Sequence, residues 1–392
     1  MQNTLTTAVE VNSRRIAAYV SGHLEEFLAV LQDVVDLESH TYGDRQVKDR
    51  CGSYLKELFE GIGFQVEAVD AGEIGFHLSG KLGDHQDKVL LVGHYDTVFP
   101  TGTTRERPFS RQGDRAFGPG IFDMKGGLVG FYMAVKALKE LDLLPADKEV
   151  DFFFNCDEEA GSGTSRERIV ALAKQAKACL VAEPGHKGEG YVTAERFGRS
   201  VVTVTAHGVA GHAGNRPEYT ANPLVELSKV VEELESRCDR SRGIWYSPVS
   251  LHGGDRGPTA MTPGDAYVIY DIRYLNEALG QEADAAVNGL CPTQPSVRFE
   301  VTGGVEKPPF IQTEESRWLW NRAKEITEEM GHTFLPARLG GGSDANFTAA
   351  AGCPTLCGLG LNGDFLHIPK EYVMIDTIPD RVALLAELIR TI

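Results

Sequence analysis

The sequence predicts an α/β protein in which a three-layer domain with a mixed sheet is interrupted by a smaller, inserted α+β domain. Three observations lead to this fold class. Apolar strands alternate with amphipathic helices up to about residue 194. Between residues 195 and 304 the strands become half-exposed and alternate apolar with polar residues. From residue 305 the first pattern returns, and a chain of 392 residues is too long for one hydrophobic core.

Residues 1–194 are expected to supply the first part of the α/β domain. Hydrophobic spacings of three and four residues predict helices, and continuous apolar runs predict buried strands. We expect helices at Ala8–Asp36, Val47–Gly61, Leu128–Leu141 and Arg166–Ala178, and strands at Phe64–Val69, Val89–Gly93, Val150–Glu159 and Ala178–Gly185. Because ligands of such folds bind at the carboxyl ends of the strands, the polar residues that follow each strand are the functional candidates.

Residues 195–304 are expected to form the inserted domain, and residues 305–392 to complete the first one. The insert has predicted strands at Gly198–Gly208, near Val249, at Ala266–Tyr274 and at Val297–Val301, and helices at Pro223–Arg237 and Glu277–Leu290. Four strands and two helices predict an antiparallel sheet covered on one face. The last segment adds a helix at Glu315–Met330, a glycine-rich loop, a strand and a closing helix from Pro379.

Composition excludes several classes of protein. Hydrophobic residues make up 42% and charged residues 24% of the chain, as in ordinary globular proteins. No apolar run approaches the ~20 residues of a membrane span. A formal net charge of −17 argues against nucleic acid or an anionic membrane as partner. Seven cysteines without paired spacing, and a start without a secretory pattern, predict a cytoplasmic protein, with a removed signal peptide as the alternative.

The stretch LLVGHYDTV places a histidine and a carboxylate at the end of an apolar strand. His94 and Asp96 point to the same side of an extended backbone, so the carboxylate can reach the ring. Such a contact fixes the tautomer and makes the other ring nitrogen a better metal ligand. For an isolated pair, a satisfied histidine at a strand end is the simpler explanation. Four further acidic or histidine sites beside glycine or proline favour a metal site instead.

These further sites are Asp123, the pair Glu158 and Glu159, Glu183, and His367. Imidazoles and carboxylates without a thiolate describe a site for Zn²⁺, Co²⁺ or Mn²⁺. Five ligands exceed the needs of one tetrahedral ion and fit two ions that share a carboxylate. Asp123, which lies among glycines that let the backbone bend, is the expected bridge. Glu158 and Glu159 face opposite ways in an extended backbone, so one can bind metal while the other acts as a general base.

Six motifs occur in order along the chain: HYD, GPGIFDMKGG, DEEAGS, AEPG, GGGSDAN and LHIPKEY. Together they resemble the dinuclear zinc metallopeptidase family of glutamate carboxypeptidases, aminoacylases, acetylornithine deacetylases and succinyl-diaminopimelate desuccinylases. The resemblance covers nearly the whole chain and is closest to the folate-hydrolysing glutamate carboxypeptidase branch. It implies a metal-dependent amidohydrolase with two Zn²⁺ ions per subunit.

The resemblance also implies a role for each candidate residue. One ion is assigned to His94 and Glu183 and the other to Glu159 and His367, with Asp123 and a water between them. Glu158 is the implied general base and acid, and Asp96 the implied partner of His94. The peptide bond after Asp123 is often cis in this family.

The inserted domain supplies two more residues through the same resemblance. His212, in GVAGHAGNRP, is the implied transition-state stabiliser of the neighbouring subunit, in a homodimer formed through this lid domain. Arg273, in YDIRY, is the implied partner of the substrate carboxylate, which a guanidinium can bind at two points. A surface histidine and a surface ion pair are the alternatives. The loop at Gly341, Gly342 and Ser343, ahead of a short helix, can offer backbone N–H groups to a carboxylate.

One stretch departs from the family. Ala260 begins the sequence AMTP where the family commonly has an asparagine in an NxxP pattern. Two interpretations remain open. Thr259 or Thr262 supplies the missing donor, or the substrate differs from a plain C-terminal glutamate.

The expected function is the hydrolysis of an amide bond that releases a free amino acid from a small peptide or an N-acyl amino acid. A glutamate carboxypeptidase-like metallopeptidase is the first choice. The alternatives are an N-acyl-amino-acid deacylase, of the aminoacylase or acetylornithine deacetylase type, and a non-catalytic binding homologue. The intact ligands and base argue against the last of these, because such proteins usually lose one or more of them.

Overall fold

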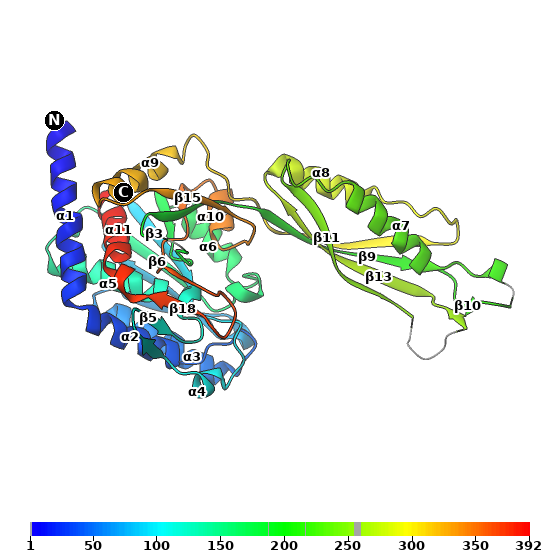
Figure 1. The fold of residues 1–392 in the computed structure, drawn as a ribbon, viewed down its shortest axis with the longest axis horizontal. Helices are drawn as coiled ribbons and strands as arrows, with labels where there is room; N and C mark the ends of the chain where they lie inside the picture. The colour runs from blue at the N-terminus through cyan, green and yellow to red at the C-terminus, as the bar shows by residue number, and fades with distance from the viewer. Residues whose placement is uncertain (1, 187, 216, 255–259) are drawn as a thin grey trace. The chain divides into compact units, whose positions relative to one another are not determined.

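The computed structural model describes residues 2–186, 188–215, 217–254 and 260–392, with the backbone alone for residues 2–11. Thr259 lies outside the described residues. The chain divides into two compact units (Figure 1). The first unit comprises Met1–Glu195, Gln312–Arg338 and Ser343–Ile392, and the second comprises Arg196–Ile311 and Leu339–Gly342. The second unit therefore ends later than the expected boundary at residue 304, because its last strand continues to Lys307.

A six-stranded mixed sheet forms the middle layer of the first unit. Its strands, in spatial order, are β1 (Gln65–Asp70), β2 (Phe76–Leu82), β6 (Glu149–Asn155), β3 (Lys88–His94), β7 (Ala178–Val181) and β16 (Thr355–Leu356). The four strands from β6 to β16 are parallel, and β1 and β2 are antiparallel to their neighbours. The mixed sheet confirms the predicted fold class.

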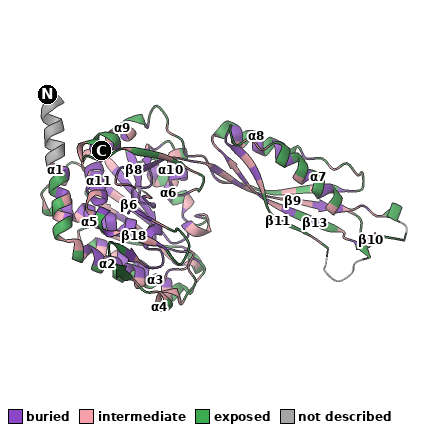
Figure 2. Ribbon diagram, viewed as in Figure 1, coloured by how far each residue is buried: buried purple, intermediate pink, exposed green. Residues whose placement is uncertain are grey.

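Helices cover both faces of this sheet. Phe152 and Phe154 of β6 belong to the large hydrophobic core, whereas Phe153 packs with Ile169 and Phe347 on the other side. Successive side chains of a strand point to opposite faces, so β6 is buried from both sides. The helices of this unit are α1 (Gln2–Gly22), α2 (Leu24–Asp36), α3 (Arg45–Gly61), α4 (Thr103–Glu106), α5 (Gly126–Glu140), α6 (Arg166–Ala173), α9 (Arg317–Glu329), α10 (Ala345–Ala350) and α11 (Ile378–Thr391). Figure 2 shows the buried residues concentrated between these layers.

Several elements of this unit differ from the expected ones. The long helix at Ala8–Asp36 is two helices, α1 and α2, separated at His23, whose backbone leaves the helical conformation. The strand β2 was not expected, because its sequence FHLSGKL lacks a continuous apolar run. The strand expected to reach Glu159 ends at Asn155, and Glu158–Ala160 forms a 3₁₀ turn.

Smaller strands complete the first unit. A four-stranded sheet contains β17 (Gly363–Asp364), β18 (Tyr372–Met374), β5 (Arg115–Phe117) and β4 (Ser110–Gln112), and β8 (Tyr191–Arg196) pairs with β15 (Leu335–Leu339). Within the described residues, no helix has both the length and the apolar character needed to cross a bilayer.

The second unit is an antiparallel sheet with two helices, as predicted. The strands, in spatial order, are β11 (Ile244–Gly253), β13 (Asp265–Tyr274), β9 (Gly198–His207) and β14 (Arg298–Lys307). Burial alternates residue by residue along β9, because one face packs on α7 (Pro223–Ser236) and α8 (Glu277–Asn288). A short ladder of β10 (Gly211–His212) and β12 (Met261–Thr262) lies outside this sheet.

Candidate metal centre and active site

Three parallel strands end at one edge of the sheet and deliver the first candidate ligands. His94 is the last residue of β3, which lies between β6 and β7 and pairs in register with both. The chain leaving β6 reaches Glu158 and Glu159, and the chain leaving β7 reaches Glu183. His94 is 1% exposed and Glu183 6%, so both side chains are withdrawn from solvent. Their position follows from the parallel topology, since the carboxyl ends of parallel strands lie together.

Asp123 lies between the two histidines. Its Oδ1 is 3.2 Å from Nε2 of His94, and its Oδ2 is 2.9 Å from Nε2 of His367. The same nitrogen of His94 lies 3.8 Å from Oε1 of Glu183, and that of His367 lies 3.3 Å from Oε1 of Glu159. The structure thus brings together all five residues expected as metal ligands, with Asp123 shared by the two halves of the cluster.

The donor set of this cluster fits divalent cations. Each Nε2 faces two carboxylate oxygens, although a neutral imidazole has only one proton to donate. Among the described residues, the buried Oε1 of Glu159 has no hydrogen-bond partner, although Nε2 of His367 lies 3.3 Å away. Carboxylate and imidazole donors without a thiolate suit Zn²⁺, Co²⁺ or Mn²⁺. One ion would be held by His94, Asp123 and Glu183, and a second by His367, Asp123 and Glu159.

The pKa values of the cluster residues are shifted by burial and by contacts between these residues. Burial raises the pKa of Glu159 to about 7. The hydrogen bond to Asp123 and the nearby carboxylate of Glu159 raise the pKa of His367 to about 10. Burial opposes ionisation of Asp123, but the hydrogen bonds with His367 and His94 hold its pKa below the usual range. Because a metal ion binds the deprotonated forms, we expect metal binding to release protons.

Asp96 connects His94 to the two adjacent glutamates. Nδ1 of His94 lies 3.4 Å from Oδ1 of Asp96 and 3.1 Å from its backbone oxygen. The Asp96 carboxylate also accepts the backbone N–H groups of Glu158 and Glu159, each at 3.2 Å, and the hydroxyl of Thr41 at 2.7 Å. Asp96 therefore orients the histidine ring and the glutamate turn together, a second task that sequence reasoning missed.

Glu158 and Glu159 diverge, although not through the extended backbone that was expected. They begin the 3₁₀ turn Glu158–Ala160, where neighbouring side chains are about a third of a turn apart. Asp157 fixes this turn, because its carboxylate accepts the N–H and hydroxyl of Thr164, each at 2.7 Å, and the hydroxyl of Ser165 at 2.6 Å. Glu159 faces His367, and the geometry of the turn implies another direction for the side chain of Glu158, which is 8% exposed.

Glu371 holds the turn that carries Asp123 and was not among the candidates. The buried carboxylate accepts the backbone N–H groups of Phe122 at 2.7 Å, Asp123 at 3.0 Å and Gly120 at 3.3 Å. The peptide bond between Asp123 and Met124 is cis, as the family resemblance implied. Glu371 lies in the motif LHIPKEY, four residues after His367. Its place in that motif was the feature of the sequence that could have identified it as a candidate.

The glycine-rich loop contributes Asp344 rather than an open nest at Ser343. The backbone N–H of Ser343 donates to Oδ1 of Asn346 at 2.9 Å, and its hydroxyl is buried. Asp344 accepts from the side chains of Asn155 and Ser162, each at 2.5 Å. It thereby ties the loop to the end of β6 and to the glutamate turn. Gly341 and Gly342 belong to the second unit, where their carbonyls accept from Arg196 at 3.0 and 3.4 Å.

His212 is the exposed last residue of β10 in the second unit, and one of its ring nitrogens already accepts hydrogen bonds. Its Nδ1 accepts the backbone N–H groups of Gly214 at 3.1 Å and Asn215 at 3.0 Å. A nitrogen that accepts cannot carry the proton, so the neutral ring has its N–H at Nε2. The next residue, Ala213, donates to the carbonyl of Ala260 at 2.8 Å, so the position that departs from the family lies beside this loop.

Arg273 lies near the end of β13 in the second unit and is partly buried. Its Nε and Nη2 donate to the two oxygens of Asp271 at 2.5 and 3.0 Å, and its Nη1 donates to the carbonyl of Gly340 at 2.8 Å. Arg199 donates to the same Asp271 at 2.7 Å. A guanidinium carries five N–H donors, so these contacts hold the side chain in place without using all of its donors.

Comparisons with known proteins agree on one family. The family model for peptidase family M20/M25/M40 matches residues 90–391. Carboxypeptidase G2 of Pseudomonas sp. (strain RS-16) is 33% identical over 374 residues, which cover 92% of this chain and 88% of that protein. Succinyl-diaminopimelate desuccinylase of Hydrogenovibrio crunogenus is 26% identical over 374 residues, covering 91% and 96%.

Solved structures show the same fold. The aminopeptidase PepT from Bacillus cereus superposes with a TM-score of 0.78 at 21% identity, covering 94% of this chain and 98% of that one. Taken with the sequence matches, this likeness extends over nearly the whole chain. The chain belongs to peptidase family M20/M25/M40 and is a metal-dependent peptide hydrolase.

Proposed function

We propose that this protein is a dinuclear carboxypeptidase that releases a C-terminal amino acid, with glutamate as the preferred residue. The observation that carries the proposal is the position of Asp123, whose two oxygens contact the two histidines separately. That arrangement suits two ions sharing one carboxylate. The 33% identity to a carboxypeptidase supports the choice of reaction within the family.

The residues divide the work of hydrolysis between them. Bound to the cluster, two divalent ions would polarise the amide carbonyl and lower the pKa of a water. Glu158 takes a proton from the attacking water and returns it to the leaving nitrogen, so that the C–N bond breaks to give a carboxylate and a free amine. Asp96 holds Glu158 and His94 in fixed positions relative to each other through the contacts described above.

His212 suits the stabilisation of the oxyanion that forms during this attack. With Nδ1 accepting from the main chain, Nε2–H is the donor that the ring presents. In our proposal this donor enters the site of the neighbouring subunit in a homodimer. An isologous pair formed by sheet edges would bring the two inserted domains together.

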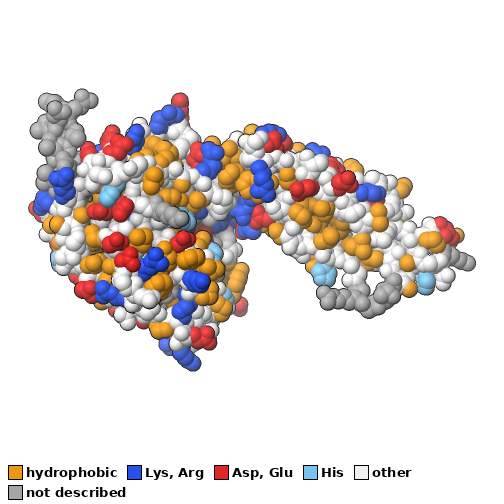
Figure 3. All heavy atoms as spheres, viewed as in Figure 1, with side chains coloured by type: hydrophobic (Ala, Val, Ile, Leu, Met, Phe, Trp, Pro, Cys, Tyr) orange, Lys and Arg blue, Asp and Glu red, His pale blue; other side chains and the backbone are white. Residues whose placement is uncertain are grey.

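Exposed apolar side chains support such a dimer. Figure 3 shows hydrophobic side chains at the surface of the second unit. On its edge strands, Val249 and Leu251 of β11 are 61% and 56% exposed, and Val305 of β14 is 58% exposed. Burial of these side chains against a second copy would remove apolar surface from water.

Arg273 suits the recognition of the substrate α-carboxylate. Asp271 and Gly340 fix the plane of its guanidinium, and a planar guanidinium binds a carboxylate at two points. A fixed side chain loses less entropy when the substrate binds. The proposal therefore requires a free α-carboxylate on the residue that leaves.

The loop that carries His367 supports an apolar acyl group on the other side of the bond. Phe365, Leu366 and Ile368 flank this histidine and are 43%, 39% and 43% exposed. Apolar side chains at this exposure offer packing surface to an aromatic or aliphatic group. A desuccinylase, by contrast, must hold the charged end of a succinyl group.

Desuccinylation is the second candidate, because several relatives at 24–27% identity are succinyl-diaminopimelate desuccinylases. A panel of hydrolysis assays separates the two. It compares an N-benzoyl and a peptidyl C-terminal glutamate, N-succinyl-diaminopimelate and N-acetylated amino acids, each at equal concentration. We expect the C-terminal glutamate substrates to have the highest kcat/KM, and a higher value for N-succinyl-diaminopimelate would replace the proposal with the second candidate.

Metal removal completes the test. We expect two ions per subunit, loss of activity on dialysis against a chelator, and recovery with Zn²⁺, Co²⁺ or Mn²⁺. Turnover by protein shown to be free of metal would contradict the proposed mechanism.

A further inference from the structure

Arg381, in the first turn of α11, is a buried arginine that donates hydrogen bonds to four main-chain carbonyls. Its side chain is fully buried. Nε donates to Gly360 at 2.9 Å, Nη1 to Glu189 at 2.8 Å and to Tyr191 at 2.7 Å, and Nη2 to Gly358 at 2.6 Å. Among the described residues, the structure records no ion pair between this guanidinium and a carboxylate.

The four carbonyls belong to two segments that meet at a metal-ligand candidate. The first segment comprises residues 183–186 and 188–191, and the second residues 358–361. The two segments bond to each other at the candidate itself, because the N–H of Gly360 donates to the carbonyl of Glu183 at 2.9 Å and that of Gly185 donates to Leu361 at 2.9 Å. The guanidinium therefore clamps the ends of a small main-chain ladder that carries Glu183.

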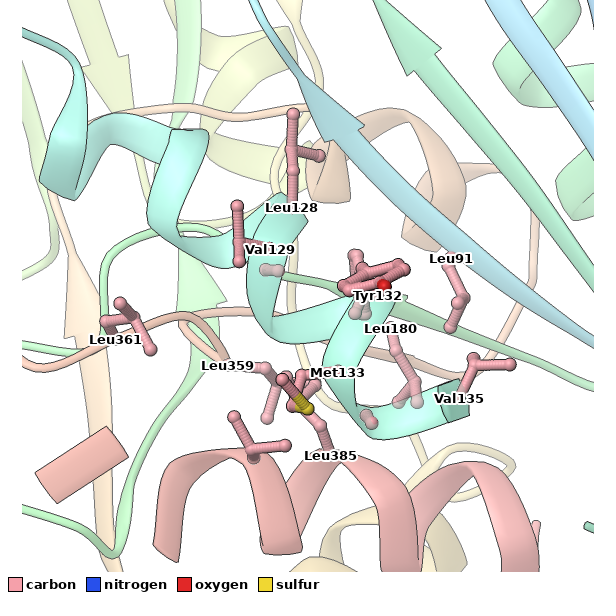
Figure 4. Packing of buried hydrophobic residues seen from close by; sticks show 14 of the residues in the cluster. Leu91, Leu128, Val129, Tyr132, Met133, Val135, Leu180, Leu359, Leu361 and Leu385 are labelled. Atoms are coloured by element: carbon pink, nitrogen blue, oxygen red, sulfur yellow. The ribbon is translucent and has the colours of Figure 1, made fainter. Parts of the chain in front are cut away.

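Two glycines of this ladder leave no room for a side chain. A Cβ atom on Gly185 would lie 2.9 Å from Nη2 of Arg381, and one on Gly360 would lie 2.4 Å from the carbonyl oxygen of Ala182. On the other side of the second segment, Leu359 and Leu361 are buried in the hydrophobic core together with residues of α5 and α11 (Figure 4). The segment is thus held by its side chains in the core and by its carbonyls on Arg381.

Core packing alone does not require an arginine at this position. A buried charge is costly unless it is compensated, and an apolar residue would fill space at lower cost. Burial lowers the pKa of Arg381 to about 10, so the guanidinium stays charged at neutral pH. What the side chain supplies is a rigid, planar set of donors that reaches both segments at once.

We propose that Arg381 is a positioning residue that sets the main chain at Glu183, so that this carboxylate can bind the ion beside His94. The proposal rests on the proposed dinuclear function. It predicts a selective effect on one ion, because Glu159, His367 and Asp123 are held by other contacts.

The test uses two variants. Arg381→Lys keeps the charge but loses the planar set of guanidinium donors, and Arg381→Gln loses both. Arg390→Lys and Arg390→Gln are the matched controls, since Arg390 lies on the same helix and pairs with Glu387. Zinc binding is measured by competition with a chelator, together with ion counting by mass spectrometry. We expect one of the two ions to bind 10–100-fold more weakly in the Arg381 variants, the usual effect of losing a partner behind a ligand, and both to bind normally in the controls.

Hydrogen exchange in the metal-free protein provides a measurement that is independent of metal and of activity. The amides of Gly185 and Gly360 should exchange faster in the Arg381 variants than in the wild type, while those of β3 stay protected. Should the Arg381 variants fail to fold, Gly185→Ala tests the ladder with Arg381 in place, because its methyl group would lie 2.6 Å from the carbonyl oxygen of Gly360 and 2.9 Å from Nη2 of Arg381. It should weaken the same single ion.

The outcomes separate this proposal from the proposed function. Wild-type affinity at both sites, equal weakening of both sites, or unchanged exchange at Gly185 and Gly360 would overturn the role of Arg381. A wild-type protein that binds fewer than two ions would instead overturn the dinuclear function, and the exchange measurement would still decide what Arg381 does.

Discussion

The carboxylate of Glu371 accepts the backbone N–H of Asp123 at 3.0 Å, and the same Asp123 contacts both histidines of the cluster. One buried acid therefore holds the main chain of the residue on which both proposed ions depend. Arg381 does the corresponding work on the other side of the cluster, where a buried cation holds the main chain at Glu183. In both places, a buried side chain outside the proposed ligand set forms its hydrogen bonds with backbone groups.

Glu371→Gln should weaken both ions and destabilise the metal-free protein. The amide group places an NH₂ against backbone N–H donors that now bond to oxygen, and an unsatisfied buried donor costs about 1–3 kcal/mol. Thermal unfolding of the metal-free protein and zinc titration measure the two effects. Glu387→Gln, a second buried acid with Arg390 as its partner, should lose stability but keep both ions. If the two variants bound zinc equally well, Glu371 would have no special relation to the cluster.

The two neighbouring glutamates should respond differently to the same change. Glu158→Gln should keep both metals and lose at least ~10² in kcat, because the proton of the attacking water has no acceptor. Glu159→Gln should weaken the ion beside His367, which its Oε1 faces. Elemental analysis and steady-state kinetics on the same preparations check both expectations. The opposite pattern of metal loss would exchange the roles of the two residues.

Arg273→Lys should raise KM more than it lowers kcat. An ammonium group cannot reproduce a two-point contact with a carboxylate, nor the fixed plane that Asp271 gives the guanidinium. Substrates with a free α-carboxylate should lose most, and their carboxamides should be poor substrates of the wild type. Equal wild-type rates on acid and amide would exclude this role for Arg273.

His212 can be tested by mixing subunits. His212→Ala and Glu158→Gln should each be nearly inactive as homodimers. In a mixed dimer, one site combines the intact Glu158 of one chain with the intact His212 of the other. Random assembly makes about half of the dimers mixed, so by symmetry counting the unfractionated mixture should recover about a quarter of wild-type activity, and dimers purified through both tags about half. Co-expression with two different tags, purification through both and assay provide the measurement, and inactive verified heterodimers would confine His212 to its own chain or remove it from the mechanism.

Glu226 should make the second unit sensitive to acid. Burial opposes ionisation of its carboxyl, but bonds from Lys229 at 2.7 Å and from the N–H of Thr293 at 2.7 Å lower its pKa to about 2. A folded pKa below the unfolded value gives stability that is complete above about pH 4.5 and is lost as the pH falls toward 2. Lys229 is partly exposed, so solvent screening reduces the contribution to about 1–3 kcal/mol.

The measurement compares wild type with Glu226→Gln. The difference between their unfolding free energies in urea should be largest near pH 7 and should shrink steadily between pH 5 and pH 3. A difference that stays constant over this range would show that the charge of Glu226 does not stabilise the fold.

Much of the candidate site could be recognised in the sequence because its residues lie in short motifs at strand ends. The β3 motif supplied His94 and Asp96, and the parallel order of strands implied that Glu183 would reach the same edge. The prediction of an extended backbone at Glu158 failed because the turn there depends on Asp157, whose partners Thr164 and Ser165 lie on the far side of the loop.

The sequence by itself determined the fold class, the inserted domain and the residue types of the metal cluster, since hydrophobic periodicity and motif order are local properties of the chain. Only the tertiary structure decided which buried charges support that cluster. Glu371 meets Gly120 across 251 positions of sequence, and Arg381 meets Glu189 across 192. Both residues bond to main-chain groups, which every residue possesses. The pattern of side chains along the sequence therefore does not identify the backbone groups that they contact. Their roles follow from the packing that brings those backbone groups to a buried charge.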